Sequence, residues 1–207
     1  MDDTAAVSPG NPCPFLRALV AHGTLADDVQ PIPAVDAAIR RVAAAGDGSP
    51  SLPSRTIRLV ALIANGVAPH QLMRNARRGL RLSELRNGPL DKKGAGSGIL
   101  DRHANLVGAE LDRLDTFAGD KQLPDGTTER GLDADELVRY MDANFDRAAG
   151  RRRAIDRRFM DAEWPVLLRV LGRDGVHGRY LAVADVRQLF TERTLPQRIL
   201  DRLAATS

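Results

Sequence analysis

Apolar residues recur at helical spacing along most of this chain, and few windows alternate with the period of two typical of a strand. Helices are expected at 33–45, 55–65, 69–78, 101–118, 133–149, 183–191 and 196–204, with a further helix over 151–171 that breaks or kinks near Pro165. The 207 residues suffice for one sizeable core, and no repeat divides them. We therefore predict an all-α, single compact multi-helix domain over 12–207, after a flexible lead over 1–11. A short hairpin around 172–181 is the expected exception.

Composition excludes several classes of protein. The 30 basic and 27 acidic residues nearly balance, with a net charge of +3, which does not favour a polyanionic partner. No apolar run approaches the ~18 residues of a membrane span, and the polar start MDDTAAVSPG does not resemble a signal peptide. One cysteine precludes an intramolecular disulfide, so nothing requires an oxidising compartment. We expect a cytoplasmic protein with no membrane partner.

The single cysteine lies in NPCPFLRALVAHGTL, residues 11–25. Pro14 suits the first position of a helix, where its missing N–H costs nothing, and Gly23 suits the end of that helix. Cys13 is therefore expected at a helix N-terminus, where free N–H groups and the helix dipole favour a thiolate. Such a thiolate is a nucleophile or a metal ligand; a buried, inert cysteine is the alternative.

The pattern P-C-P-x-L-x-x-L-x-x-H-G-x-L, residues 12–25, resembles the N-terminal signature of the heme-thiolate peroxidases, the family of chloroperoxidases and unspecific peroxygenases. That family usually has asparagine where this chain has Arg17. The resemblance implies a fold of the heme-thiolate peroxidase type and a heme b cofactor whose iron is bound by Cys13. Pro14 and Leu16 would complete this part of the cofactor site, with the backbone N–H groups of Leu16 and its neighbours donating to the sulfur.

The stretch from Arg157 to Pro196 is also similar to the family, which has an arginine, an aromatic residue and a glutamate in this region. The resemblance implies that Glu163 is the distal acid–base group that handles peroxide. Arg157 or Arg158 would orient its carboxylate, although the spacing is a residue or two shorter than in the family. An ordinary surface glutamate is the alternative for Glu163.

The middle of the chain departs from the family, which has an acidic motif and a serine that bind magnesium against a heme propionate. KKGAGS, residues 92–97, stands at that place, with Ser97 aligned to the serine, Lys93 in place of an acidic ligand and Ala95 in place of the aspartate. Magnesium prefers oxygen ligands, so it is not expected here. The ammonium of Lys93, or of its neighbour Lys92, would supply positive charge to the propionate instead. A solvated glycine-rich loop without heme contact is the alternative.

The implied function is that of a peroxidase or peroxygenase that uses hydrogen peroxide to oxidise or oxygenate a small organic molecule. The alternative is a non-catalytic heme-binding protein, a sensor or carrier, which the lost acidic motif favours. The same residue pattern serves peroxidation, oxygenation and halogenation.

Two other kinds of site fit the sequence less well. The segment 147–158 holds six arginines, but neighbouring acidic residues and few interleaved aromatics favour a solvated helical face over a nucleic-acid patch. The acidic residues of 120–136 do not match the alternating positions of an EF-hand calcium loop.

Overall fold

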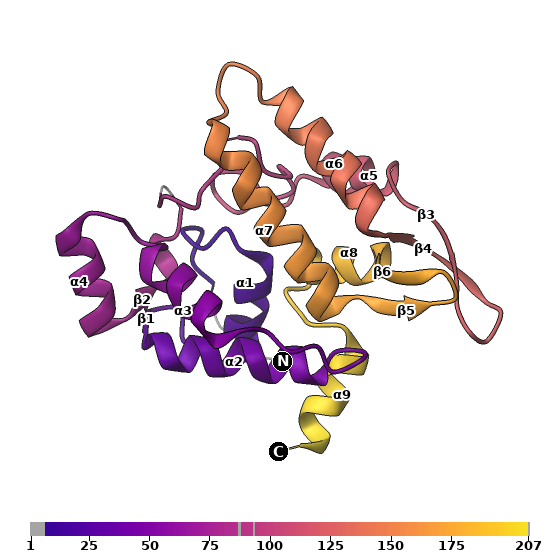
Figure 1. The fold of residues 1–207 in the computed structure, drawn as a ribbon, viewed down its shortest axis with the longest axis horizontal. Helices are drawn as coiled ribbons and strands as arrows, with labels where there is room; N and C mark the ends of the chain where they lie inside the picture. Colours follow the sequence, from indigo (N-terminus) through magenta and orange to yellow (C-terminus); the bar gives the residue numbers. More distant parts are fainter. Residues whose placement is uncertain (1–6, 87, 93, 207) are drawn as a thin grey trace.

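The computed structural model describes residues 7–86, 88–92 and 94–206 (Figure 1). The helices are α1 (Pro14–Ala21), α2 (Ile32–Ala45), α3 (Ser54–Ile63), α4 (Pro69–Arg78), α5 (Gly108–Asp115), α6 (Ala134–Arg147), α7 (Ala154–Leu171), α8 (Val183–Thr191) and α9 (Gln197–Ala205), with a 3₁₀ turn η1 (Leu82–Glu84). The strands are β1 (Val29–Gln30), β2 (Leu80–Arg81), β3 (Gly119–Gln122), β4 (Thr128–Leu132), β5 (Arg173–Gly175) and β6 (Gly178–Ala182). Helices dominate, but the fold is a mixed one.

The prediction of an all-α protein is wrong, because the described chain contains a four-stranded antiparallel sheet in the order β3-β4-β6-β5. A second, two-stranded sheet pairs β1 with β2. The hairpin expected around 172–181 is confirmed as β5 and β6, with Arg173 opposite Tyr180. The β3–β4 hairpin was missed because β3 reads GDKQ and contains no apolar residue, and Leu132 is the apolar residue of β4. These strands are stabilised by pairing with each other and with β6, which is distant in sequence.

Local signals in the sequence explain where α6 begins. The Asp133 carboxylate accepts the N–H of Glu136 at 3.0 Å, and the Glu136 carboxylate accepts the N–H of Asp133 at 2.9 Å. This reciprocal capping box satisfies two donors that a helix start leaves unpaired.

Two expected helices differ from the structure. α7 continues through Pro165 rather than breaking there, since Trp164 and Leu167 on either side of it are buried in the core. The helix expected over 101–118 is reduced to α5, because the Asp101 carboxylate accepts the N–H groups of His103 and Asn105 and folds this segment into a turn.

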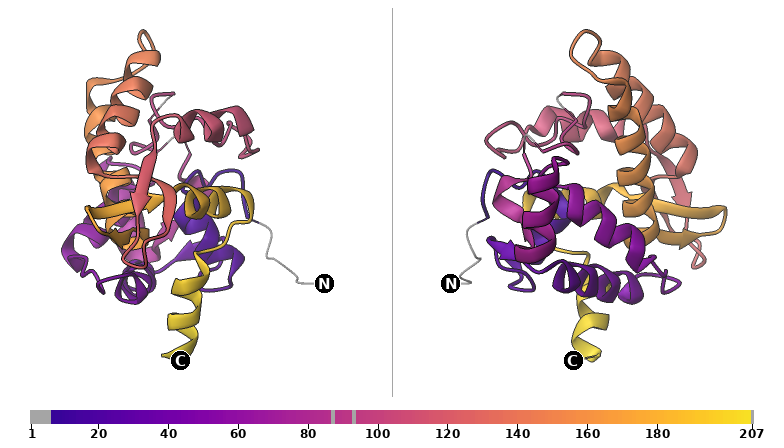
Figure 2. Two further views of the ribbon diagram at one scale, coloured as in Figure 1. Left: turned by 90° about the vertical axis from the view of Figure 1, so that its right-hand side faces the viewer. Right: turned by 60° about the vertical axis from the view of Figure 1, so that its left-hand side comes forward.

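One hydrophobic cluster forms the core, and its buried residues come from most of the chain, from Phe15 in α1 to Ile199 in α9. In Figures 1 and 2, α1 lies inside the molecule while α6 and α7 form an antiparallel pair at one end. α1 packs against α8, and α7 and α8 pack against β6. Within the expected lead, residues 1–6 lie outside the described chain, whereas Asn11 is fully buried. None of the described helices is both long and apolar enough to cross a membrane.

Candidate functional site

Cys13 is the residue immediately before α1, and Pro14 occupies the first position of that helix. The backbone N–H groups of Leu16 and Phe15 act to lower the pKa of the Cys13 thiol, although the side chain makes no capping hydrogen bond at this helix start. The side-chain oxygen of Asn11 accepts the N–H of Cys13 at 3.2 Å, and this hydrogen bond fixes the backbone just before the helix. The role of Leu16 and its neighbours as donors to the sulfur stays a prediction.

The protonation state of Cys13 differs from the sequence-based expectation. Burial raises the pKa of the thiol to about 11, although the N–H groups of Leu16 and Phe15 act to lower it. Loss of hydration thus outweighs the helix terminus, and the group is a neutral thiol at pH 7. A metal cation at the sulfur would displace this proton, because a coordinating thiol is deprotonated by the cation's charge.

Lys92 and Glu163 form an ion pair that is near enough to this thiol to act on its pKa. Lys92 lies in the loop that follows η1, Glu163 lies on α7, and the Lys92 Nζ is 2.5 Å from the Glu163 Oε2. Both groups act on the pKa of Cys13: the carboxylate raises it and the ammonium lowers it. Three side chains that are far apart in sequence therefore form one cluster, here called the Cys13 cluster.

The ion pair also raises the pKa of the Lys92 ammonium. Burial acts to lower the pKa of Lys92, but the adjoining Glu163 carboxylate more than offsets this effect, so the pKa is raised. Lys92 is therefore positively charged at pH 7, and it engages the carboxylate of the pair. Within the Cys13 cluster, the sulfur is the donor left for a soft metal ion.

The arginines expected to orient Glu163 have other surroundings. Arg157 forms ion pairs with Asp142, at 2.8 Å, and with Asp161. Arg158 is exposed on the surface of α7. The contact between Lys92 and Glu163 was not predicted, since a pairing between a loop and a distant helix leaves no local signal in the sequence.

The segment expected to replace the magnesium site packs against the core. Ala95 and Ile99 are fully buried, and the Ser97 hydroxyl accepts the N–H of Ile99 at 3.4 Å. This packing argues against a loop that is solvated throughout. Lys93 lies outside the described residues. Across the described ranges, no three His, Cys, Asp or Glu side chains are grouped so that they could hold a metal ion.

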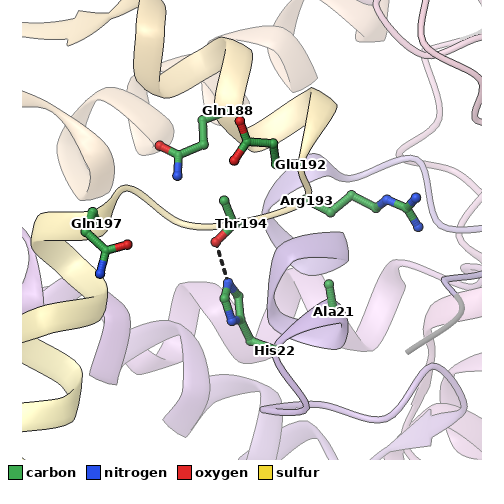
Figure 3. Close-up of a pocket in the computed structure, with 7 residues that line it drawn as sticks. All are labelled: Ala21, His22, Gln188, Glu192, Arg193, Thr194 and Gln197. Atoms are coloured by element: carbon green, nitrogen blue, oxygen red, sulfur yellow. Dashed lines mark hydrogen bonds between the residues drawn. The ribbon is translucent and has the colours of Figure 1, made fainter. Parts of the chain in front are cut away.

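A cavity of about 290 Å³ lies at the other end of α1 (Figure 3). Its lining is largely polar and comes from the end of α1, from α8 and from the start of α9. His22, which follows the last residue of α1, has its Nε2 2.6 Å from the Thr194 Oγ1. This bond ties the end of α1 to the segment between α8 and α9.

Searches with the chain against protein-family models, curated proteins and solved structures find no match. The similarity of residues 12–25 and 157–196 to the heme-thiolate peroxidases is therefore a similarity of motifs. A function for this chain is inferred from its own residues and their geometry.

Proposed function

We propose that this protein is a heme-thiolate peroxidase or peroxygenase, which uses hydrogen peroxide to oxidise or oxygenate a small organic molecule. One observation carries the proposal: Cys13, Lys92 and Glu163 lie in one cluster. Each comes from a different one of the three segments that, in the family the chain resembles, surround one heme. If Cys13 were an inert cysteine and Glu163 an ordinary surface glutamate, nothing would require these three segments to lie close together.

The donor chemistry at Cys13 fits a heme iron. The sulfur is a soft ligand at a helix start, and the backbone N–H groups of Leu16 and Phe15 act on its pKa in the direction that favours a thiolate. These donors would spread the charge of a bound thiolate and set its basicity. When bound, a thiolate-ligated heme supplies the redox chemistry that favours heterolytic cleavage of an O–O bond.

Glu163 is suited to the proton movements of such a reaction. Peroxide must lose a proton from one oxygen and gain one on the other, which requires a group that both accepts and donates. The Glu163 carboxylate has that capacity, and its side chain is 30% exposed, which leaves it accessible to a small molecule. Lys92 supplies the positive charge beside the carboxylate, a role that the resemblance gave to Arg157 or Arg158.

The same ion pair favours a second candidate function. If Lys92 keeps the Glu163 carboxylate engaged when heme is bound, that carboxylate does not exchange protons with peroxide. The protein would then bind heme through Cys13 without turnover, as a sensor or a carrier does.

The test is the absorbance of the purified full chain after incubation with hemin, reduction and addition of carbon monoxide. A strongly red-shifted Soret band in the wild type and its loss in Cys13→Ala would support thiolate ligation, because no second cysteine is present. Peroxide-dependent oxidation of a phenolic or aromatic reporter then selects the enzyme, whereas the band without turnover selects the non-catalytic protein. A wild type without the band contradicts both.

A further inference from the structure

A second cavity, of about 240 Å³, lies beside α1, and its lining includes none of the three residues of the Cys13 cluster. Arg17 lines it from α1, and Arg193 lines it from the segment that follows α8. The apolar part of the lining is formed by Leu100, Ala104, Leu106 and Phe190, and Asn105 and Thr191 add uncharged polar groups. The cavity thus combines two cationic side chains with an apolar surface.

Arg17 is an unusual side chain to bury. It is 6% exposed, and its Nη1 donates to the backbone oxygens of Ser8 and Asn11 at 3.0 and 3.1 Å. These acceptors satisfy hydrogen-bond donors but carry no negative charge.

Arg193 adds a second positive charge at the same cavity. Its backbone φ is 55°, a left-handed conformation that side chains other than glycine adopt at an energetic cost. Figure 3 shows its side chain extending away from His22 and Thr194, which line the first cavity.

The two arginines repel one another. Burial is the largest cause of the lowered pKa of Arg17, and Arg193 is the next; Asp27 opposes them, while Arg86 adds to them. Asp27 also accepts the N–H of Ser8. Cationic groups therefore dominate around Arg17, and an anion between the two guanidinium groups would relieve this repulsion.

We propose that this cavity binds a small organic carboxylate, with its anionic group between Arg17 and Arg193 and its apolar body against Leu100, Leu106 and Phe190. The volume, about 240 Å³, lies just below the ~300–1,000 Å³ typical of drug-sized ligands, which favours a compact acid with one ring or a short chain. A bare inorganic anion would leave the apolar side chains of the lining without a partner.

Isothermal titration calorimetry of the full chain tests the site with three probes: benzoate, its uncharged analogue benzamide, and inorganic phosphate. Benzoate should bind the wild type, and benzamide should bind at least about 10-fold more weakly because it lacks the charge. Failure of benzoate to bind, equal binding of benzamide, or tighter binding of phosphate would each overturn the proposal.

Arg193→Gly is the informative variant, because glycine adopts a positive φ without steric cost and so preserves the fold. Its benzoate affinity should fall about 10- to 100-fold, while its thermal midpoint stays equal to or above that of the wild type. Arg139→Gln, at an exposed position on α6, removes the same charge elsewhere and should leave the affinity unchanged. Equal affinity in Arg193→Gly and the wild type would remove this arginine from the site and overturn the proposal.

Discussion

The Lys92 ammonium lies 2.5 Å from the Glu163 carboxylate, and the two charges act on the Cys13 thiol in opposite directions. Since the two charges oppose each other and burial is the largest cause, burial decides the direction in which the pKa of the sulfur moves. A pair of this kind is neutral as a whole but exposes its neighbour to a full charge when either partner is removed. The pKa of Cys13 should therefore report whether both members of the ion pair are present.

Removing either partner should shift the pKa of Cys13 in a predictable direction. Glu163→Gln removes the charge that raises it, so the pKa should fall below about 11, whereas Lys92→Met should raise it further. The measurement is the pH dependence of iodoacetamide alkylation of the folded protein, followed by mass spectrometry. Asp161→Asn is the matched control, since this exposed carboxylate of α7 pairs with Arg157. Superimposable profiles for all four proteins would contradict the cluster.

The raised pKa of the partly buried Cys13 thiol should also make the protein less stable in alkali. The pKa of Cys13 is about 11 in the folded chain against 9.0 for a free thiol, so the unfolded state loses its proton first as the pH rises. The free energy of unfolding should therefore fall by about 2–3 kcal/mol between about pH 9 and pH 11. Urea denaturation of the wild type and Cys13→Ala at several pH values isolates this contribution. A constant difference between the two proteins across that range would show that Cys13 is not buried as a thiol.

Elements with signals inside their own segment were predicted accurately. The sequence predicts α4 over Pro69–Arg78 and α8 over Val183–Thr191, and both have these bounds. Pro69 at the first position marks the start of α4, and apolar residues at helical spacing mark α8. The capping residue Asp133 likewise determines where α6 begins.

Features that depend on distant residues were not predicted. β3 has no apolar alternation of its own, and it belongs to a sheet because β4 and β6 pair beside it. The Pro124–Asp125–Gly126 turn between β3 and β4 was the available signal for that hairpin. The position of Cys13 at a helix start follows from the neighbouring prolines, but its raised pKa depends on burial by elements from the rest of the chain.

The four-stranded sheet, which the sequence did not predict, can be tested at Gly131 in β4. A Cβ at Gly131 would lie 2.4 Å from the ring of Tyr180, which is 1% exposed and donates its hydroxyl to Glu129 at 2.6 Å. Since this ring has no room to move, Gly131→Ala should lower the free energy of unfolding by about 1–3 kcal/mol. Gly108→Ala is the control, because nothing lies within 4 Å of its added Cβ and α5 begins there. Equal stability of the two variants in urea denaturation would contradict the packing of β4 against β6.

The final prediction concerns the role of Glu163 in turnover by the heme-loaded protein. Glu163→Gln keeps the size of the side chain and much of its hydrogen bonding but cannot take up a proton. If the carboxylate moves the proton of peroxide, the initial rate of peroxide-dependent oxidation should fall about 10²- to 10⁴-fold, the usual contribution of a general acid–base group.

The Soret band of Glu163→Gln should remain that of the wild type, because Cys13 is unchanged. Asp161→Asn removes a carboxylate from the same helix at an exposed position and should retain the wild-type rate. Lys92→Met separates the two candidate functions further, since it frees Glu163 from its ion pair. A rate that rises in Lys92→Met and falls in Glu163→Gln would identify the carboxylate as the proton carrier and the ammonium as its restraint. Equal rates in the wild type and Glu163→Gln would remove this residue from the mechanism.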